Sequence, residues 1–228
     1  NCTGVVVDQY TFWGKIGSDG VPNYDSVSAI DYNNNSLGVP HPTAFSFSHC
    51  IIQYAKTGIS SNDFEGGFVH DVQIVAVNAG VRFQTPGKTF AHAVIHDSHV
   101  NADAVCVAVQ GMFEVFIHDN LLYNQLSVNP GTGVSVSNGS QFVNVHHNTF
   151  ENYNETVNMT AIVFDDCQWS IAQGNIFRRC DSKDGQPNGV GVWMTPKSGN
   201  CKAIAHDQMF VLTEHAFLNH GIDNTLVP

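Results

Sequence analysis

The sequence is poor in basic residues and has no long apolar run. Nine lysines and arginines stand against 20 aspartates and glutamates, which gives a formal net charge of −11, and the basic residues form no cluster. A chain with this charge is repelled by nucleic acid and by anionic lipid, so we expect neither as a partner. No stretch approaches 18 apolar residues, so we also expect no membrane insertion.

Cysteine and acidic motifs of the kind that bind metals are missing as well. The chain has no Cys-x-x-Cys pair and no Asp-x-Asp-x-Asp loop, so we expect no metal site and no other cofactor. Reduced, buried cysteines are expected, with one disulfide as the alternative. Cys167 and Cys201 each precede a strand in successive repeats and are expected to stack. The six cysteines are Cys2, Cys50, Cys106, Cys167, Cys180 and Cys201.

What the sequence does contain is an internal repeat, which is complete once between Phe113 and Phe150. Each unit has a short alternating strand, a turn with Asn, an apolar residue, a variable loop and a second strand. Three columns define the alignment. The column two residues before the turn Asn holds Ser48, His70, His96, His118, His146, Gln173 and His206. One residue before this first column, a second column holds Phe47, Val69, Ile95, Ile117, Val145, Ala172 and Ala205. Four residues after the first column, a third column holds Ile52, Ile74, Val100, Leu122, Phe150, Phe177 and Phe210.

This repeat predicts an all-β fold, a right-handed parallel β-helix solenoid with about seven readable coils. We expect the β-helix domain to span residues 44–228, with two main strands in each coil and room for a third short one. Residues 1–43 are irregular, and they fit either degenerate coils or a lateral extension. In the turn column Asn120, Asn148 and Asn175 predict a polar ladder, with Ser98 and Gln208 as substitutes, because an Asn amide can bond to the same amide one coil away.

The pattern Val143-Asn-Val-His-His-Asn-Thr-Phe resembles that of the pectate-lyase-like superfamily of right-handed parallel β-helices, over roughly residues 44–210. This superfamily includes pectate lyases, polygalacturonases, alginate lyases and epimerases, and the typically trimeric phage tailspike depolymerases. The resemblance implies action on, or adhesion to, long anionic or branched polysaccharides along the outer face of a sheet. Asp165-Asp166 looks like the paired aspartates of polygalacturonases, but the Gly-His-Gly and Arg-Ile-Lys elements are absent. The signatures of pectate lyases and alginate epimerases are absent too, so no family's catalytic set carries over.

The histidine column is the most unusual feature of the repeat. Residues in one column of a parallel sheet lie about 4.8 Å apart, so His96, His118 and His146 should line up on an outer face. A neighbouring outward column is largely apolar and needs a cover. Burial in a subunit or intrachain contact, a ligand-binding strip and a metal ladder are the alternatives for this face. The neighbouring column holds Phe68, Val94, Phe116, Asn144, Ile171 and Ile204.

Acidic and aromatic residues gather in and beside the loops between strands, as a sugar site requires. Glycoside hydrolysis needs two carboxyl groups that face one bond, whereas a lyase or epimerase needs a base and a cation beside a uronate. The candidate catalytic residues are Asp165, Asp166, Glu151 and Glu155. The candidate substrate-binding residues are Trp193, Tyr123, Tyr153, Arg178, Arg179 and His146.

We therefore expect an extracellular or virion-surface protein that binds and cleaves polysaccharide as a glycosidase or lyase and forms a tailspike-like homotrimer. The alternative is a noncatalytic adhesion or structural spike module that also trimerises. A minor third possibility is an ice-binding solenoid, although flat rows of Thr-x-Thr are missing. The sequence does not name the sugar.

Overall fold

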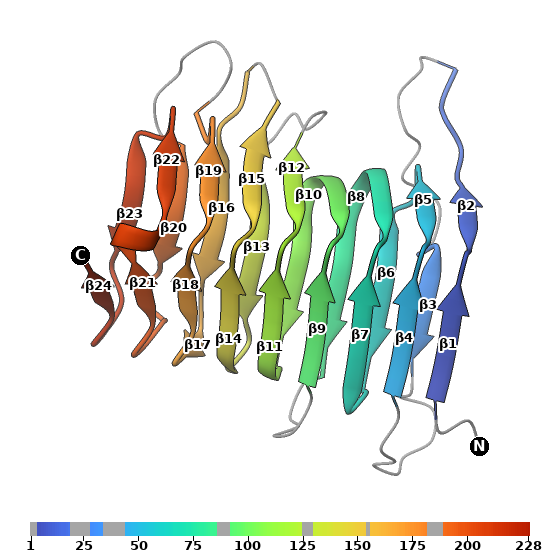
Figure 1. Ribbon diagram of the computed structural model, residues 1–228, viewed down its shortest axis with the longest axis horizontal. Coiled ribbons are helices and arrows are strands. Elements are labelled where there is room, and N and C mark those ends of the chain that lie inside the picture. Colours follow the sequence, from blue (N-terminus) through green and yellow to red (C-terminus); the bar gives the residue numbers. More distant parts are fainter. Residues whose placement is uncertain are drawn as a thin grey trace.

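The computed structural model describes residues 4–18, 28–33, 44–85, 92–124, 130–153, 156–181 and 189–228. In these ranges the fold is all-β, and one short 3-10 turn, η2 (Ala205–Asp207), interrupts the strands. Figure 1 shows the strands stacked side by side along the long axis, with the termini at opposite ends. The pairing between successive repeats is parallel throughout, so the expected all-β class with parallel sheets is confirmed. None of the described helical segments is long or apolar enough to cross a bilayer.

Three rows of strands make up the stack, and the first row is a sheet of its own. Its members pair in the order in which they occur along the chain, and a short strand, β17 (Cys167–Gln168), pairs beside β14. The first row comprises β1 (Gly4–Asp8), β4 (Ala44–Ser48), β7 (Gly66–His70), β9 (His92–His96), β11 (Phe113–His118), β14 (Ser140–His146), β18 (Ile171–Gln173), β21 (Lys202–Ile204) and β24 (Thr225–Val227).

The other two rows share one sheet, because β8 (Gln73–Gln84) and β10 (His99–Gln110) each run through both. The second row comprises β2 (Thr11–Trp13), β5 (Ile51–Gln53), the starts of β8 and β10, β12 (Leu121–Asn124), β15 (Thr149–Asn152), β19 (Ile176–Arg178) and β22 (Met209–Val211). The third row comprises β3 (Ile30–Asn33), β6 (Thr57–Asn62), the ends of β8 and β10, β13 (Gly131–Ser137), β16 (Met159–Phe164), β20 (Val190–Met194) and β23 (His215–Asn219).

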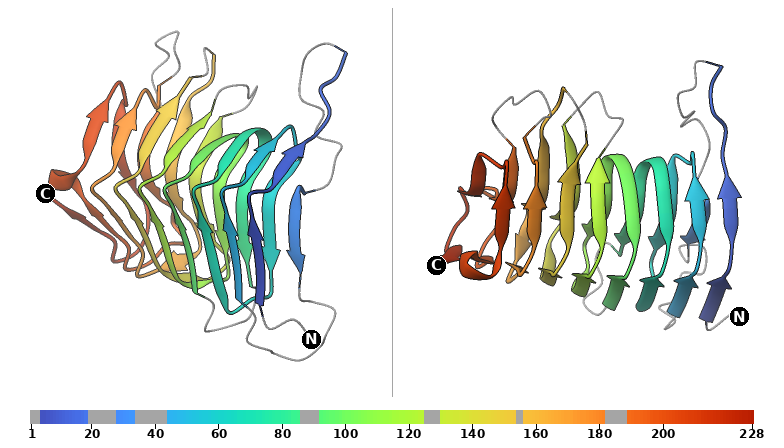
Figure 2. Two further views of the ribbon diagram at one scale, coloured as in Figure 1. Left: turned by 45° about the vertical axis from the view of Figure 1, so that its right-hand side comes forward. Right: turned by 45° about the horizontal axis from the view of Figure 1, so that its top comes forward.

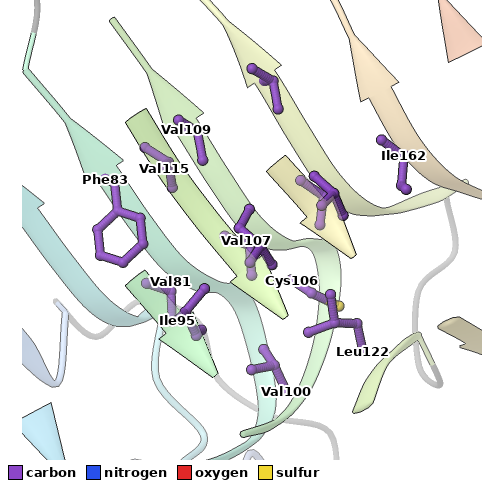
Figure 3. Packing of buried hydrophobic residues seen from close by; sticks show 14 of the residues in the cluster. Val81, Phe83, Ile95, Val100, Cys106, Val107, Val109, Val115, Leu122 and Ile162 are labelled. Carbon is purple, nitrogen blue, oxygen red and sulfur yellow. The ribbon is translucent and has the colours of Figure 1, made fainter. Parts of the chain in front are cut away.

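The core fills the space that the three rows enclose. Side chains alternate along a strand, so in β14 Val143 and Val145 are buried while Asn144 and His146 face outward. The in-register pairing stacks each buried position on its counterpart one repeat away, as Ile117 stacks on Ile95 and Val145. Figure 3 shows the valines, isoleucines and Leu122 of several repeats packed into one continuous interior, and Figure 2 shows the rows around it.

Large and small residues face each other where the second row turns into the third. The large column ends in Phe150, Phe177 and Phe210, whose rings stack at 5.3 and 4.7 Å. Opposite it, a Cβ atom on Gly133 would lie 2.5 Å from Phe150 and 2.5 Å from the carbonyl oxygen of Ala161. Small side chains at this column therefore let the third row approach the aromatic stack closely. The small column is Gly58, Gly80, Cys106, Gly133, Ala161, Gly191 and Ala216.

The predicted amide ladder is confirmed at the turn between the first and second rows. Asn120 donates from its backbone N–H and its amide to Asn148 Oδ1 at 3.1 and 2.9 Å, and Asn148 donates in the same way to Asn175 at 3.0 and 3.2 Å. Ser98 and Gln208 extend the ladder at its two ends, since the Ser98 N–H donates to Asn120 and the Asn175 amide donates to Gln208. The ladder satisfies buried polar groups in each repeat from Ser98 to Gln208.

Two details of the predicted repeat are wrong. Ala172 pairs with Ala203 rather than with Ala205, so the histidine column continues into Ile204 and not His206, and Lys202 follows Ile171. The two additional residues are taken up by η2, after which Phe210 is back in register with Phe177. No loop separates the strands at 101–103 either, because β10 runs through that segment with shifts in its register.

A third strand in each repeat, which the sequence left open, is present in the second row. The strands β1, β2 and β3 pair in parallel with β4, β5 and β6 and so belong to the same three rows. The boundary between residues 1–43 and 44–228 stays a prediction.

Candidate functional site

A groove of about 620 Å³ follows the turn between the first and second rows. One wall holds the turn carboxylates Asp71, Asp97 and Asp119, which recur at the same point of successive repeats. The opposite wall is formed by the first outward residues of the second row. The wall residues recur because the turn has the same length in each repeat, so the groove runs along the stack. The opposite wall consists of Ile51, Gln73, His99 and Leu121.

The turn residue of each repeat adopts a left-handed backbone conformation. Asp71, Asp97 and Asp119 have φ angles of 52°, 48° and 56°, and His49 and His147 occupy the same point at 51° and 54°. Asp tolerates this region better than most residues because its short side chain can bond locally. The conformation turns the carboxylate out of the sheet and toward the groove.

Each of these carboxylates holds a histidine of the preceding column. The Nδ1–H groups of His70, His96 and His118 donate to the next residue's carboxylate at 2.8, 2.7 and 2.8 Å. Local contacts between histidine and aspartate therefore recur in these three successive repeats. The donated hydrogen bond lowers the pKa of Asp71 and of Asp119.

The imidazole rings of the column form a stack on the outer face of the first row. Ring centroids of His70, His96, His118 and His146 are separated by 5.2, 5.1 and 4.9 Å, with interplanar angles of 6°, 2° and 11°. At the end of the stack, His146 Nδ1 lies 3.0 Å from Nδ1 of His147. Burial, and secondarily the neighbouring His118 and His147, lower the pKa of His146.

Tyr123, Glu151 and Arg178 form one outward column on the second row. They pair directly across β12, β15 and β19, and the ring of Tyr153 packs edge-on against Tyr123 at 5.4 Å. A hydrogen bond with the Glu151 side chain raises the pKa of Tyr153, and burial raises that of Tyr123. The column therefore combines two aromatic rings, a carboxylate and a guanidinium, the groups that stack on and bond to a sugar ring.

His99 joins the groove to this column. Its ring lines the groove and lies 4.9 Å from the ring of Tyr123. Burial lowers the pKa of His99, and its Nε2 atom is inaccessible to solvent without a hydrogen-bond partner among the described residues. Groove and column thus form one continuous strip, which we call the second-row strip: Gln73, His99, Tyr123, Glu151, Tyr153 and Arg178 with the three turn aspartates.

A separate polar patch lies on the third row. Asp165 follows β16, and its Oδ1 accepts a hydrogen bond of 2.6 Å from the hydroxyl of Thr195, which follows β20. Trp193 faces the same side of β20, and its indole N–H donates to His220 Nδ1 at 3.3 Å. Asp166 is exposed in a left-handed turn, with φ at 49°.

The predicted site residues therefore fall into three places. Tyr123, Glu151, Tyr153, Arg178 and Arg179 lie in or beside the second-row strip; Asp165, Asp166 and Trp193 lie on the third row; and His146 lies on the outer face of the first row. Glu151 and Asp165 lie at opposite ends of the segment that contains β16, whose direction Figure 1 shows to be opposite to that of β15. Glu155 lies outside the described residues.

Adjacent imidazole rings of the stack have their centroids 4.9 to 5.2 Å apart. Within the described ranges, no three His, Cys, Asp or Glu side chains come together in a way that could hold a metal ion.

The groove wall is the part of the site that sequence reasoning missed. Gln73, His99 and Leu121 occur three residues after the histidine of each repeat, and this constant spacing was the signal that could have found it. The predicted stacking of Cys167 and Cys201 is present, with 3.8 Å between their Sγ atoms.

Comparison of the chain with protein-family models, with curated proteins and with solved structures finds no match.

Proposed function

We propose that this chain is a right-handed parallel β-helix of the pectate-lyase-like type and that it binds polysaccharide along the second-row strip. Support for the solenoid comes from the parallel, in-register pairing of strands across successive repeats and from the amide ladder at a turn of constant length. The proposed location is extracellular or on a virion surface, where such chains meet polysaccharide.

The contact between His99 and Tyr123 is the observation that carries the binding proposal. It connects a groove of about 620 Å³ with an aromatic and charged column, so that one extended ligand can touch both. Binding sites combine a concave surface with a few polar groups that fix the orientation of the ligand. Tyr123 and Tyr153 supply ring area, while Glu151, Arg178 and Gln73 supply hydrogen bonds to hydroxyl groups.

The charge of the groove restricts the ligand. Asp71, Asp97 and Asp119 follow one another along the wall, and the chain as a whole carries −11. Neighbouring carboxylates repel the negative charges of a uronate chain, whereas they accept hydrogen bonds from the hydroxyl groups of a neutral sugar. The proposed ligand is therefore a neutral polysaccharide rather than a polyuronate.

Cleavage is the further part of the proposal, with Glu151 as the acid or base within the strip. A second carboxyl group across the same bond is needed for hydrolysis. The turn aspartates are the candidates for that role on the same side of the chain, and Glu155 stays a candidate from the sequence alone. Asp165 and Asp166 belong instead to the third-row patch, where Trp193 offers a sugar-stacking surface.

Binding of a panel of neutral, O-antigen, capsular and uronate polysaccharides tests the proposal. The Tyr123→Ala variant should lose at least about fivefold in affinity, since stacking on an aromatic ring contributes on the order of 1–3 kcal/mol. Tyr10→Ala, which removes an exposed tyrosine outside the strip, is the matched control. Unchanged binding by a folded Tyr123→Ala protein would refute the assignment of the strip.

Assays of reducing ends and of unsaturated uronates on the same panel separate a hydrolase from a lyase. Loss of product in Glu151→Gln, with binding retained, is expected if the strip is catalytic. Loss in Asp165→Asn but not in Glu151→Gln would move the cleavage site to the third-row patch.

A noncatalytic adhesion or spike module that forms a homotrimer is the second candidate function. The separation of Glu151 from Asp165 favours the lack of catalysis. Polysaccharide binding without any product from the whole panel is the result that this candidate predicts.

A further inference from the structure

The outer face of the first row carries an exposed apolar column at its centre. Phe68 and Phe116 are 50% and 41% exposed, and Val94 lies between them in register. Asn144 and Ile171 continue the column beyond Phe116. Isolated exposed apolar side chains are ordinary, but a contiguous column of them on a sheet marks an interaction surface.

A second aromatic group borders this column. The ring of Phe142 packs against Phe113 at 5.0 Å and stacks on Trp169 at 5.3 Å, and Phe142 and Trp169 are 42% and 43% exposed. Both residues have left-handed backbone conformations, with φ at 56° and 51°. Such a conformation is unfavourable for a bulky side chain, so the chain accepts strain at two successive repeats and keeps these rings on the surface.

The face carries little of the chain's charge. Its described strand positions include Asp8, Glu114 and Lys202, and Glu114 is paired with His92 at 2.9 Å. With neutral histidines, the strand positions of this face carry a single negative charge, and the turn carboxylates Asp71, Asp97 and Asp119 border the face.

The size of the face suits a stable contact between two copies. Nine strands at about 4.8 Å spacing extend about 38 Å along the stack, and strands of about five residues extend about 16 Å across it. The projected area is about 600 Å² per copy, or about 1,200 Å² for a pair, which reaches the lower end of the range for specific interfaces.

We infer that two copies of this chain pack through the outer faces of their first rows, in a contact that requires the imidazole stack of His70, His96, His118 and His146 to be uncharged. Each copy has one such face, so the contact is the same patch on both subunits and closes on itself as a two-fold dimer. A trimer needs two different contact surfaces on every copy.

The histidine requirement follows from the position of the stack beside the apolar column. Burial in a contact penalises a charged imidazole, and like charges about 5 Å apart repel each other. His146 lies against His147 rather than a bonded carboxylate, and the neighbouring His118 and His147 disfavour its charge. Long-range repulsion between the acidic chains is screened beyond about 8 Å at physiological salt. The stability of the dimer is therefore determined by the cost of placing charged histidines in the contact. The charged and titratable groups around the stack are Asp8, His49, Asp71, Asp97, Asp119 and His147.

Sedimentation equilibrium of the whole chain at pH 8.0 and 0.15 M salt tests the contact. A concentration-dependent dimer is expected, and Phe116→Glu should weaken it at least about 100-fold, because it places a charge at the centre of the contact. Leu212→Glu, which alters an exposed leucine at the end of the second row, should leave the dimer unchanged. A monomer at all concentrations, a trimer, or a dimer insensitive to Phe116→Glu would overturn the inference.

Repeating the measurement at pH 6.0, above the isoelectric point of about 5.4, tests the role of the imidazoles. The dimer should weaken at least about tenfold, since histidine gains charge in this range. The triple variant His96→Gln, His118→Gln and His146→Gln should keep its dimer at pH 6.0. Glutamine is a matched choice because Gln173 already continues the column. Equal affinity of the unaltered chain at both pH values would refute the histidine requirement.

Discussion

The amide ladder allows one substitution to be worked out in detail, Asn148→Ala. The Asn148 side chain is fully buried, and its oxygen accepts from the N–H and the amide of Asn120. Its own amide lies within bonding distance of the carbonyl oxygens of Ile117 and His146 and of Asn175 Oδ1. An amide has two N–H groups, so these three acceptors share two donors and the side chain makes about four bonds.

Alanine removes all four bonds and leaves their partners buried without replacement. At about 1 kcal/mol for each bond, the expected loss in the free energy of unfolding is about 4 kcal/mol. With a urea dependence of about 3 kcal/mol per molar, the unfolding midpoint should fall by about 1.3 M. The neighbouring repeats should lose stability together, because the ladder is continuous from Ser98 to Gln208.

Urea unfolding followed by circular dichroism measures this loss, at a protein concentration low enough to exclude self-association. Asn78→Ala is the matched control, because the Asn78 side chain makes no hydrogen bond to another described residue and the substitution therefore removes none. Its midpoint should change by less than about 0.3 M, as for an ordinary surface substitution. Equal midpoints for Asn148→Ala and Asn78→Ala would refute the reasoning that the ladder stabilises the stack.

Three further predictions concern packing, pH and the thiols. Gly133→Ala should lower the free energy of unfolding in urea by about 2–3 kcal/mol, because the new Cβ atom would lie 2.5 Å from Phe150. Gly199→Ala should be nearly neutral, because its new Cβ atom would lie 3.7 Å from the carbonyl oxygen of Ile222. The free energy of unfolding should be at its maximum above pH 7 and should fall as the pH drops through 6.5. The reason is that His99 and His146 have lowered pKa values in the folded protein, so the unfolded chain binds more protons than the folded one. A flat profile between pH 7.5 and 5.5 would contradict this. Burial raises the pKa of Cys106 and of Cys180 to about 12, so a thiol-specific reagent should modify them only on unfolding, and rapid labelling of the native protein would contradict their placement.

Sequence periodicity predicted the rows because each position in a repeat has a fixed chemical requirement. Ile95, Ile117 and Val145 must all fill the same interior space, so their column can be read without knowing the shape of the molecule. The alignment failed at Ala205 because η2 takes up two additional residues there without any loss of apolar character in the flanking positions. An alanine two residues away satisfied the pattern equally well.

The relative placement of the candidate site residues was harder to predict from the sequence than the rows of strands. Glu151 and Asp165 are only 14 positions apart in the chain, yet β16 carries one away from the other across the third row. Sequence proximity between two carboxylates says little when a strand of six residues, about 20 Å long, lies between them. The side of a repeat on which a residue emerges must be known before two residues can be assigned to one site.

Constant turn length explains why the groove is a continuous surface. The turn from the first row to the second keeps the same length from His49 to Gly174, so the residues on its two sides face each other in the same way in every repeat. The connections between the second and third rows differ in length from repeat to repeat, and side chains on them have no fixed spacing. In a stacked fold of this kind, a row of polar residues beside a turn of constant length builds a continuous surface from a repeated local geometry. The aspartates at 71, 97 and 119 are such a row, and the spacing that orders the core also orders them into a wall.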